Sequence, residues 1–457
     1  MKSSPLLFLL LLPHLLNAQE RHPKVTTFSQ MLTQGHFAGR YRMNSFIYDA
    51  GSRGESHQTA GVGGSLLYTS ADLKGFSFTS GLYFSQSLGD ANLDTHRYGK
   101  DTFSSKALAE GNRRYMRTFA QNYLAYQNEY IELKLGDFLF KSFLLSPHDT
   151  KMIPNAFEGA SLELKMSEES RLKLAYLTKQ KLRDHEQFHA VLVYSKYDGN
   201  DDGAMHRGLT QEKLNAKGVN DRLLVAEVHL NPSSQSSFRV GYTAVPKLIS
   251  SATLEGTYQF NLNKEMSIKP AIKYMHQFDN GAGAIGGASL RDNTIGYSNP
   301  NSLNSSLIAS KVVFTAKPLT LHLGYSKVAD KGDIVAPWHG LPTGGYSRTM
   351  STTNWYANTQ SFMLKADYTF PKERLFEGLK LIGCYSLNNF DDTKPALMAD
   401  TNIATFDMIK TFQTYPNLEL KLRSIVVSQD HEVQNRDGTI KKNPSYKALR
   451  LEMNYRF

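Results

Sequence analysis

LRLEMNYRF, residues 449–457, alternates between two kinds of side chain over its whole length. The odd-numbered positions are apolar or aromatic: Leu449, Leu451, Met453, Tyr455 and Phe457. The even-numbered positions are charged or polar: Arg450, Glu452, Asn454 and Arg456. A period of two is the side-chain period of a β-strand, so this segment predicts a strand with one apolar and one polar face. The segment runs to the last residue of the sequence and ends on an aromatic side chain.

The same alternation recurs along the chain in segments of about ten residues, the length that spans a membrane in a β-barrel. The clearest are FSFTSGLYF (76–84), YIELKLGD (130–137), RLKLAYL (171–177), MSIKPAIKY (266–274) and NLELKLRS (417–424). Short turns, for example at 70–75 and 317–319, alternate with long polar loops. The long loops fall near 89–116, 139–155, 183–220, 279–303, 328–358 and 429–445.

Tight turns on one side and long loops on the other are typical of an up-and-down barrel in an outer membrane. We therefore predict an all-β fold, an 18-stranded antiparallel transmembrane up-and-down β-barrel over residues 36–457. Its sixteenth strand, within 403–415, is the poorest, because its faces do not separate cleanly. Every backbone donor and acceptor needs a partner in lipid, so we expect the last strand to pair with the first. A secreted β-sandwich or solenoid is the alternative fold.

The first residues predict export. MKSSPLLFLLLLPHLLNAQE (1–20) contains a basic residue, a Leu-rich run and the small residue Ala18, which together indicate a cleaved signal peptide over 1–18. We then expect segment 19–35 in the periplasm and the barrel in the outer membrane of a Gram-negative cell. The mean hydropathy of −0.40 fits a soluble secreted protein and a barrel equally well, because half of each barrel strand faces water. The single cysteine, Cys384, excludes an internal disulfide.

The charges of the predicted strands indicate what the lumen attracts. The chain carries a net charge of +10, and a lipid-facing Arg or Lys costs about 2–4 kcal/mol at the membrane midplane, so the charged faces are expected to point inward. Basic residues of the first and the last two strands then share one sector of the wall: Arg40, Arg42, Lys421, Arg423, Arg450 and Arg456. Such a strip attracts carboxylates. The alternative is that these residues form interior ion pairs, with Glu419 or Glu452, that only hold the barrel together.

Three blocks of the sequence resemble OprD-type outer-membrane porins. KLGDFLFKSFLLSPHDTKMIPNAFEGASLEL (134–164) is similar to the strand, constriction loop and return strand of that family. LTLHLGYSKV (319–328), GLPTGGYSRTMSTTNWYAN (340–358) and QSFMLKADY (360–368) are similar to its strand, Gly-rich inward loop and next strand. NLELKLR (417–423) and LRLEMNY (449–455) resemble its two closing strands. The resemblance extends over essentially the whole mature chain.

The resemblance implies a barrel narrowed by two inward-folded constriction loops. It also implies a porin for passive, partly selective diffusion of small carboxylate-bearing solutes, such as basic amino acids, small peptides or other organic acids. The loop sequences depart from those of members that transport basic amino acids best. Four residues match positions of the family's basic ladder: Arg42, Lys421, Arg423 and Arg450. Arg40 joins them from the alternation alone, and Asp149 and Glu158 are the candidates for the acidic side of the constriction.

The expected partners are carboxylate-bearing solutes, lipopolysaccharide and outer-membrane lipid, and the barrel assembly machinery, which reads a closing strand that ends in Phe. A homotrimer fits the size of the chain, although the lipid-facing residues show no polar patch that would mark a subunit interface. Neither a nucleic acid, a cofactor nor a metal is expected.

Two motifs point to other functions. HEQFH (185–189) matches H-E-x-x-H, which on a helix presents two zinc-binding histidines and a glutamate base, but here it lies in a predicted loop. DGNDDG (198–203) begins like a calcium loop, although Leu209 stands where the last ligand is needed. A barrel-borne metalloprotease, and a surface adhesin that binds through loop 183–220 of a closed barrel, are the alternatives to a porin. We predict that the protein is not an enzyme.

Overall fold

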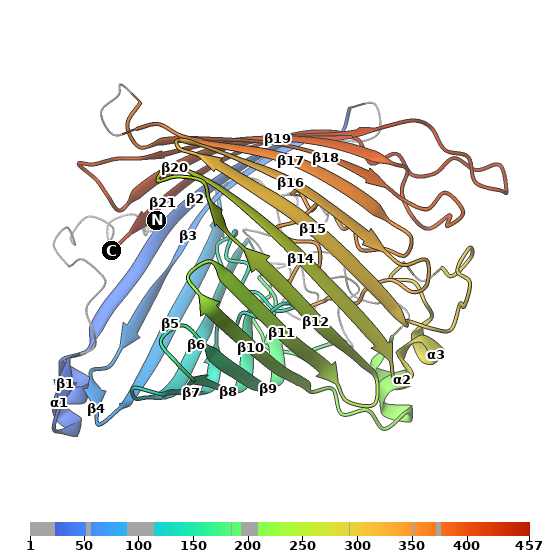
Figure 1. The fold of residues 1–457 in the computed structure, drawn as a ribbon. Coiled ribbons are helices and arrows are strands. Elements are labelled where there is room, and N and C mark those ends of the chain that lie inside the picture. The colour runs from blue at the N-terminus through green and yellow to red at the C-terminus, as the bar shows by residue number, and fades with distance from the viewer. Residues whose placement is uncertain are drawn as a thin grey trace, which may run out of the picture.

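The computed structural model describes residues 23–51, 56–88, 114–183, 185–192, 209–291, 293–350, 352–371 and 376–457. Within these ranges, eighteen long strands form one closed antiparallel barrel (Figure 1). In chain order they are β2 (His36–Asp49), β3 (His57–Thr69), β5 (Phe76–Ser87), β6 (Tyr115–Gln127), β7 (Ile131–Phe138), β8 (Ala156–Lys165), β9 (Arg171–Lys181), β10 (Leu223–Ser233), β11 (Ser236–Val245), β12 (Ile249–Tyr258), β14 (Met266–Asp279), β15 (Ser305–Ala316), β16 (Leu319–Val328), β17 (Gln360–Thr369), β18 (Leu379–Asn389), β19 (Thr401–Thr411), β20 (Leu418–Gln429) and β21 (Tyr446–Arg456).

Short elements accompany these long strands. They are β1 (Lys24–Val25), β4 (Asp72–Leu73), β13 (Phe260–Asn261), α1 (Phe28–Thr33), α2 (Gln211–Ala216) and α3 (Ala282–Gly286). No helix in the described part of the chain is long and apolar enough to cross a membrane. The signal peptide predicted over 1–18 lies outside the described residues.

The barrel closes between its first and last long strands. β2 and β21 pair antiparallel, from Arg40 opposite Arg456 to Asp49 opposite Lys447. Beyond this ladder, the Gly39 amide donates to the Phe457 carbonyl at 2.8 Å. Figure 1 shows the blue β2 beside the red β21. The predicted pairing of the last strand with the first is confirmed, and the sandwich and solenoid alternatives are wrong.

The inner and outer faces separate as the alternation predicts. On β21, Leu451 is 51% exposed and points outward, whereas Arg450 and Glu452 on the other face are each 7% exposed. The sixteenth long strand is β19, which the sequence placed within 403–415 and which begins at Thr401. Its inner Asp407 is buried and its outer Phe406 is exposed, so the tertiary contacts sort the two faces that the sequence left mixed.

Turns and loops lie at opposite rims, as predicted. The turns 70–75 and 317–318 join β3 to β5 and β15 to β16 at one rim, and the loops 139–155 and 329–359 leave from the other. One connection at the long-loop rim is short, because residues 246–248 join β11 to β12 through Lys247 in a left-handed conformation (φ 64°).

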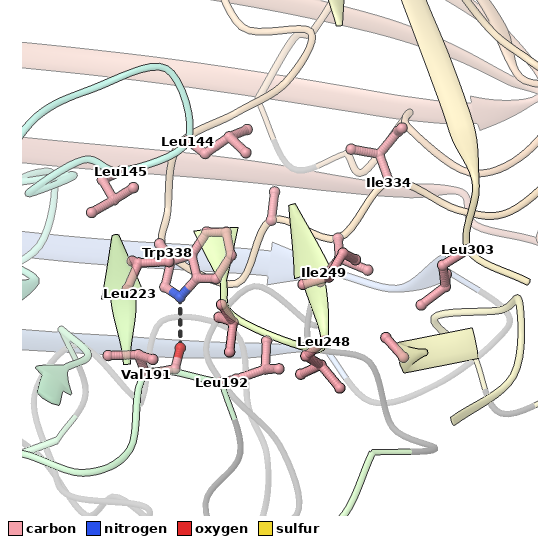
Figure 2. Packing of buried hydrophobic residues seen from close by; sticks show 14 of the residues in the cluster. Leu144, Leu145, Val191, Leu192, Leu223, Leu248, Ile249, Leu303, Ile334 and Trp338 are labelled. Atoms are coloured by element: carbon pink, nitrogen blue, oxygen red, sulfur yellow. Dashed lines mark hydrogen bonds between the residues drawn. The ribbon is translucent and has the colours of Figure 1, made fainter. Parts of the chain in front are cut away.

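The long loops and the neighbouring strand ends pack in one apolar core (Figure 2). Leu192, Leu248, Leu303 and Trp338 come from four different connections and are at most 2% exposed. Trp338 donates its indole N–H to the Val191 carbonyl at 2.6 Å. Burial of an aliphatic side chain of this size contributes about 1.5–3 kcal/mol, so this core holds the loops in defined positions at the mouth of the barrel.

Candidate functional site

Loop 139–155 crosses the lumen from one wall to the other. At its beginning, the Phe143 amide donates to Glu227 of β10 at 3.0 Å. Further along, the Asp149 carboxylate pairs with the Arg40 guanidinium of β2, with one N–O contact at 2.6 Å. In the sheet β10 and β2 lie on opposite sides of the β7–β8 pair from which the loop emerges. The predicted inward course of this loop is therefore confirmed.

Loop 329–359 also folds inward and follows the wall. The Tyr346 hydroxyl donates to Glu255 of β12 at 2.8 Å, and the Thr349 and Ser386 hydroxyls lie 2.9 Å apart on the loop and on β18. Close approach of the loop depends on Gly324 of β16, because a Cβ there would lie 1.9 Å from the Tyr346 carbonyl oxygen. A glycine in a strand commonly marks such an approach of another backbone.

The two loops are joined by backbone hydrogen bonds inside the barrel. The Gly340 amide donates to the Leu144 carbonyl at 3.0 Å, and the Ser146 amide donates to the Trp338 carbonyl at 3.1 Å. Between these bonds, His339 forms an isolated antiparallel bridge with Leu145. The contact between the loops thus behaves as a short two-stranded ribbon that narrows the lumen.

Arg40 and Arg42 meet Asp149 as a group. Arg42 reaches the Asp149 carboxylate at 3.4 Å, and its guanidinium also donates to Asn454 and to the Lys151 carbonyl. Arg40 is 14% exposed and Asp149 is 32% exposed, so the cluster is partly open to solvent. Two of the predicted ladder residues and one of the predicted acids are therefore neighbours.

The remaining ladder residues contact two other carboxylates. Arg450 pairs with Glu452 at 2.8 Å. Arg423 pairs with Asp407 at 2.6 Å, and Lys421 lies 3.8 Å from the same carboxylate. The alternative interpretation expected interior ion pairs with Glu419 or Glu452, and Arg450 forms such a pair with Glu452. Glu419 instead lies 3.4 Å from the side-chain amide of Asn454. The five ladder cations and the three carboxylates Asp149, Asp407 and Glu452 together carry a formal charge of +2.

Glu158 does not join this group. It lies on β8, where its carboxylate accepts from the Thr178 hydroxyl and from the Lys179 ammonium of β9, each at 2.8 Å. Both acids were candidates for the acidic side of the constriction. Asp149 lies on the crossing loop, and Glu158 lies beside it on the return strand.

A second polar cluster, which the sequence did not predict, anchors both loops. Arg239 of β11 bridges Glu227 at 3.0 Å and Glu255 at 3.3 Å, and these are the acids that hold Phe143 and Tyr346. On the neighbouring wall, the Lys273 and Lys311 ammonium groups each lie 4.6 Å from the centre of the Tyr346 ring. Both acids lie on inner positions of their strands, which alternation could have indicated, but only the loop contacts show their role.

Asp333 is expected to make the docking of loop 329–359 depend on pH. This fully buried carboxylate accepts from the Leu290 and Ala357 amides and from the Tyr297 hydroxyl. Burial raises the pKa of Asp333 from its usual 3.8 to about 6. The docked loop therefore binds the proton more tightly than the undocked loop. We therefore expect its stability to be greatest below the usual pKa and to fall, by about 3 kcal/mol, as the pH rises from there to about 6.

We expect hydrogen exchange to report this change. After correction for intrinsic rates, amides of loop 329–359 should lose protection equivalent to about 2 kcal/mol between about pH 4 and about pH 7. Asp333→Asn is the matched control, because it cannot titrate. Equal pH dependence in the wild type and in Asp333→Asn would contradict the assignment.

The structure describes one of the two competing motifs. Residues 185–189 are not helical: the His185 Nδ1 and His189 Nε2 atoms lie 2.9 Å apart, and Glu186 accepts from the Arg117 amide. The zinc-protease interpretation needs both histidines on one helical face, so it is wrong on geometry. In the described ranges, no three His, Cys, Asp or Glu side chains are grouped to hold a metal ion. DGNDDG (198–203) lies outside the described residues.

Of three comparisons with known proteins, the one with solved structures found similar folds. A comparison with family models and one with curated protein sequences found no match. Among solved structures, Acinetobacter baumannii OccAB1 superimposes with a TM-score of 0.71 at 11% identity, covering 94% of this chain and 98% of that one. Pseudomonas aeruginosa OpdK, solved with vanillate, gives 0.70 at 13% identity, covering 92% and 98%. Pseudomonas aeruginosa OpdQ gives 0.66 at 16%, covering 94% and 99%. Over nearly its whole length, the chain has the fold of the OprD-type outer-membrane porins.

Proposed function

We propose that this protein is an outer-membrane porin through which small carboxylate-bearing solutes diffuse passively. The observation that carries the proposal is the basic strip of Arg40, Arg42, Lys421, Arg423 and Arg450 on three adjoining strands, facing a loop that crosses the lumen. The fold shared with solved porins supports the channel, and the similar structure of OpdK was solved with vanillate, a carboxylate.

The strip suits a solute that passes from one cation to the next. Guanidinium groups bind carboxylates with two parallel hydrogen bonds. Binding at each cation must nevertheless be weak enough for the solute to leave. Asp149, Asp407 and Glu452 already neutralise part of the strip, which keeps this binding weak. Basic side chains of the strip already bind these three carboxylates, so the carboxylates are less available to a basic solute. We therefore propose that the channel prefers organic acids to basic amino acids.

Single-channel recording in a planar bilayer tests the proposal. We expect conductance steps, a reversal potential in a KCl gradient that shows preference for chloride, and interruption of the current by benzoate. Benzamide is the matched probe, since it has the same shape without the charge. Equal responses to benzoate and benzamide would refute the carboxylate preference. Absence of conductance would refute the porin and favour the adhesin.

Cys384 provides a built-in reporter of the lumen. It is the only cysteine of the chain and lies on an inner position of β18, opposite Lys365. Ion pairs nearby join four cations to two carboxylates: Lys365 and Lys380 to Asp367, and Lys421 and Arg423 to Asp407. The electrostatic attraction of an anion to one net positive charge about 7 Å away is about 2 kcal/mol at an effective dielectric constant of about 20.

We therefore expect an anionic methanethiosulfonate to modify Cys384 at least about tenfold faster than a cationic one, relative to a free thiol. The ratio should fall in high salt, which screens the charges beside Cys384. Cys384→Ser controls for unspecific labelling. A ratio near unity at low salt would contradict a basic lumen. Binding of lipopolysaccharide, contact with the assembly machinery and a homotrimer remain predictions from the sequence.

A further inference from the structure

The N-terminal helix α1 is fixed against the turn rim of the barrel. Its first turn carries a capping box, in which the Thr27 hydroxyl accepts from the Gln30 amide and the Gln30 side chain accepts from the Thr27 amide. Just before it, β1 pairs in parallel with β4, which lies in the turn between β3 and β5. The Ala71 amide of that turn donates to the Met31 carbonyl at 3.0 Å. The barrel therefore sets the orientation of the helix.

One arc of this helix is apolar, and only part of the arc is covered. Met31 is 6% exposed and packs against Val25 and Ala71. Phe28 is 65% exposed and Leu32 is 43% exposed. At 3.6 residues per turn, Phe28 and Leu32 lie on the same side of the helix, about 40° apart. Because the barrel holds the helix in place, these two apolar side chains stay on its uncovered side, where contact with water is unfavourable.

The uncovered arc continues the lipid-facing surface of the barrel. The Tyr68 hydroxyl of β3 donates to the Leu32 carbonyl at the end of the helix. Tyr68 stands two residues after the outward-facing Leu66 and therefore on the same outer face. Its ring lies 5.0 Å from that of Phe37, which is 61% exposed, and 5.6 Å from that of Phe78. Figure 1 shows α1 beside β1 and β4 at the lower end of the blue strands.

We propose that α1 is an interfacial membrane anchor, with Phe28 and Leu32 inserted into the phospholipid leaflet at the turn rim. The inference rests on the barrel lying in a membrane. Aromatic side chains gather at membrane–water boundaries, and short amphipathic segments lie there with the apolar side in the acyl region. Lys24 and Lys74 are exposed beside the helix and are placed to meet lipid phosphates.

Contact quenching in vesicles tests this anchor. The full-length protein carrying Phe28→Trp is reconstituted in phosphatidylcholine brominated at shallow acyl positions, and its quenching is compared with that of Thr33→Trp. Thr33 is exposed and lies about 140° from Phe28 around the helix, on the polar side. The native Trp338 and Trp355 are buried in the loops, and the unmodified protein supplies their background. Leu323→Trp, on the outer face of β16, is the positive control for membrane insertion.

We expect bromolipid to quench the residue-28 signal about threefold more than the residue-33 signal, because only the first lies in the acyl region. Equal quenching by aqueous iodide at both positions would show that Phe28 faces water, and would overturn the proposal. Protection of position 28 from both bromolipid and iodide would mean that protein covers it, and would overturn it as well. Absence of bromolipid quenching at Leu323→Trp would instead refute the membrane barrel itself. A failure of the anchor and a failure of the barrel are therefore distinguishable.

Discussion

Gly340→Val is expected to separate the two inward loops and to enlarge the channel. A Cβ at position 340 would lie 1.9 Å from the Leu144 carbonyl carbon and 2.3 Å from its Cα. These are backbone atoms, which cannot turn aside as a flexible side chain would. Overpacking of this kind costs about 1–3 kcal/mol, which is comparable with the gain from the two hydrogen bonds that join the loops. The ribbon of Leu144–Ser146 and Trp338–Gly340 should therefore open.

A change of about 1–3 kcal/mol shifts the ratio of separated to joined loops by roughly 5- to 150-fold. Single-channel recording should show a larger mean conductance and more current noise, with unchanged far-ultraviolet circular dichroism. Gly383→Val is the matched control, since a Cβ at that position on β18 would have no atom within 4 Å. Conductance that rises equally in both variants, or in neither, would show that the contact between the loops does not set the width of the lumen.

Replacement of three of the four ladder arginines by glutamine is expected to abolish the preference for anions. In Arg42→Gln/Arg423→Gln/Arg450→Gln, two cations and three carboxylates remain of the eight charged side chains, so the formal charge falls from +2 to −1. A carboxylate about 6 Å from one unit charge gains about 3 kcal/mol at an effective dielectric of about 20. Screening reduces this gain, and it does so less in a narrow lumen than at the surface.

The ratio of anion to cation permeability should drop more than about tenfold, and the reversal potential in a KCl gradient should change sign. The matched control removes three cations outside the lumen, in Lys247→Gln/Lys264→Gln/Lys317→Gln. These lysines lie in the turns and short loops at the two rims and are exposed. A reversal potential that moves by the same amount in both triple variants would point to the overall charge of the protein rather than to the strip.

The strands, their inward charges and the closing pair follow from the linear pattern, because a barrel wall is one residue thick. Each side chain on such a wall faces either lipid or lumen, so a period of two specifies its environment without knowledge of distant contacts. LRLEMNYRF is the clearest case, and the exposed Leu451 beside the buried Arg450 confirms it. The structure brings Arg40, Arg42 and Asp149 together at the crossing loop, and their part in transport stays a prediction.

The partners of these side chains depend on the course of the loops, which no local pattern encodes. Arg40 and Asp149 are separated by 109 positions, and the Arg450 guanidinium reaches the Thr150 carbonyl across 300. Asp407 was hidden in the strand with mixed faces, and Glu227 and Glu255 gain their role only because Phe143 and Tyr346 dock on them. Glu158 lies beside the crossing loop, at the start of the return strand, and its partners on β9 likewise follow from the tertiary structure. Alternation specifies the direction in which a side chain points, whereas the packing of loops across the lumen specifies what it meets there.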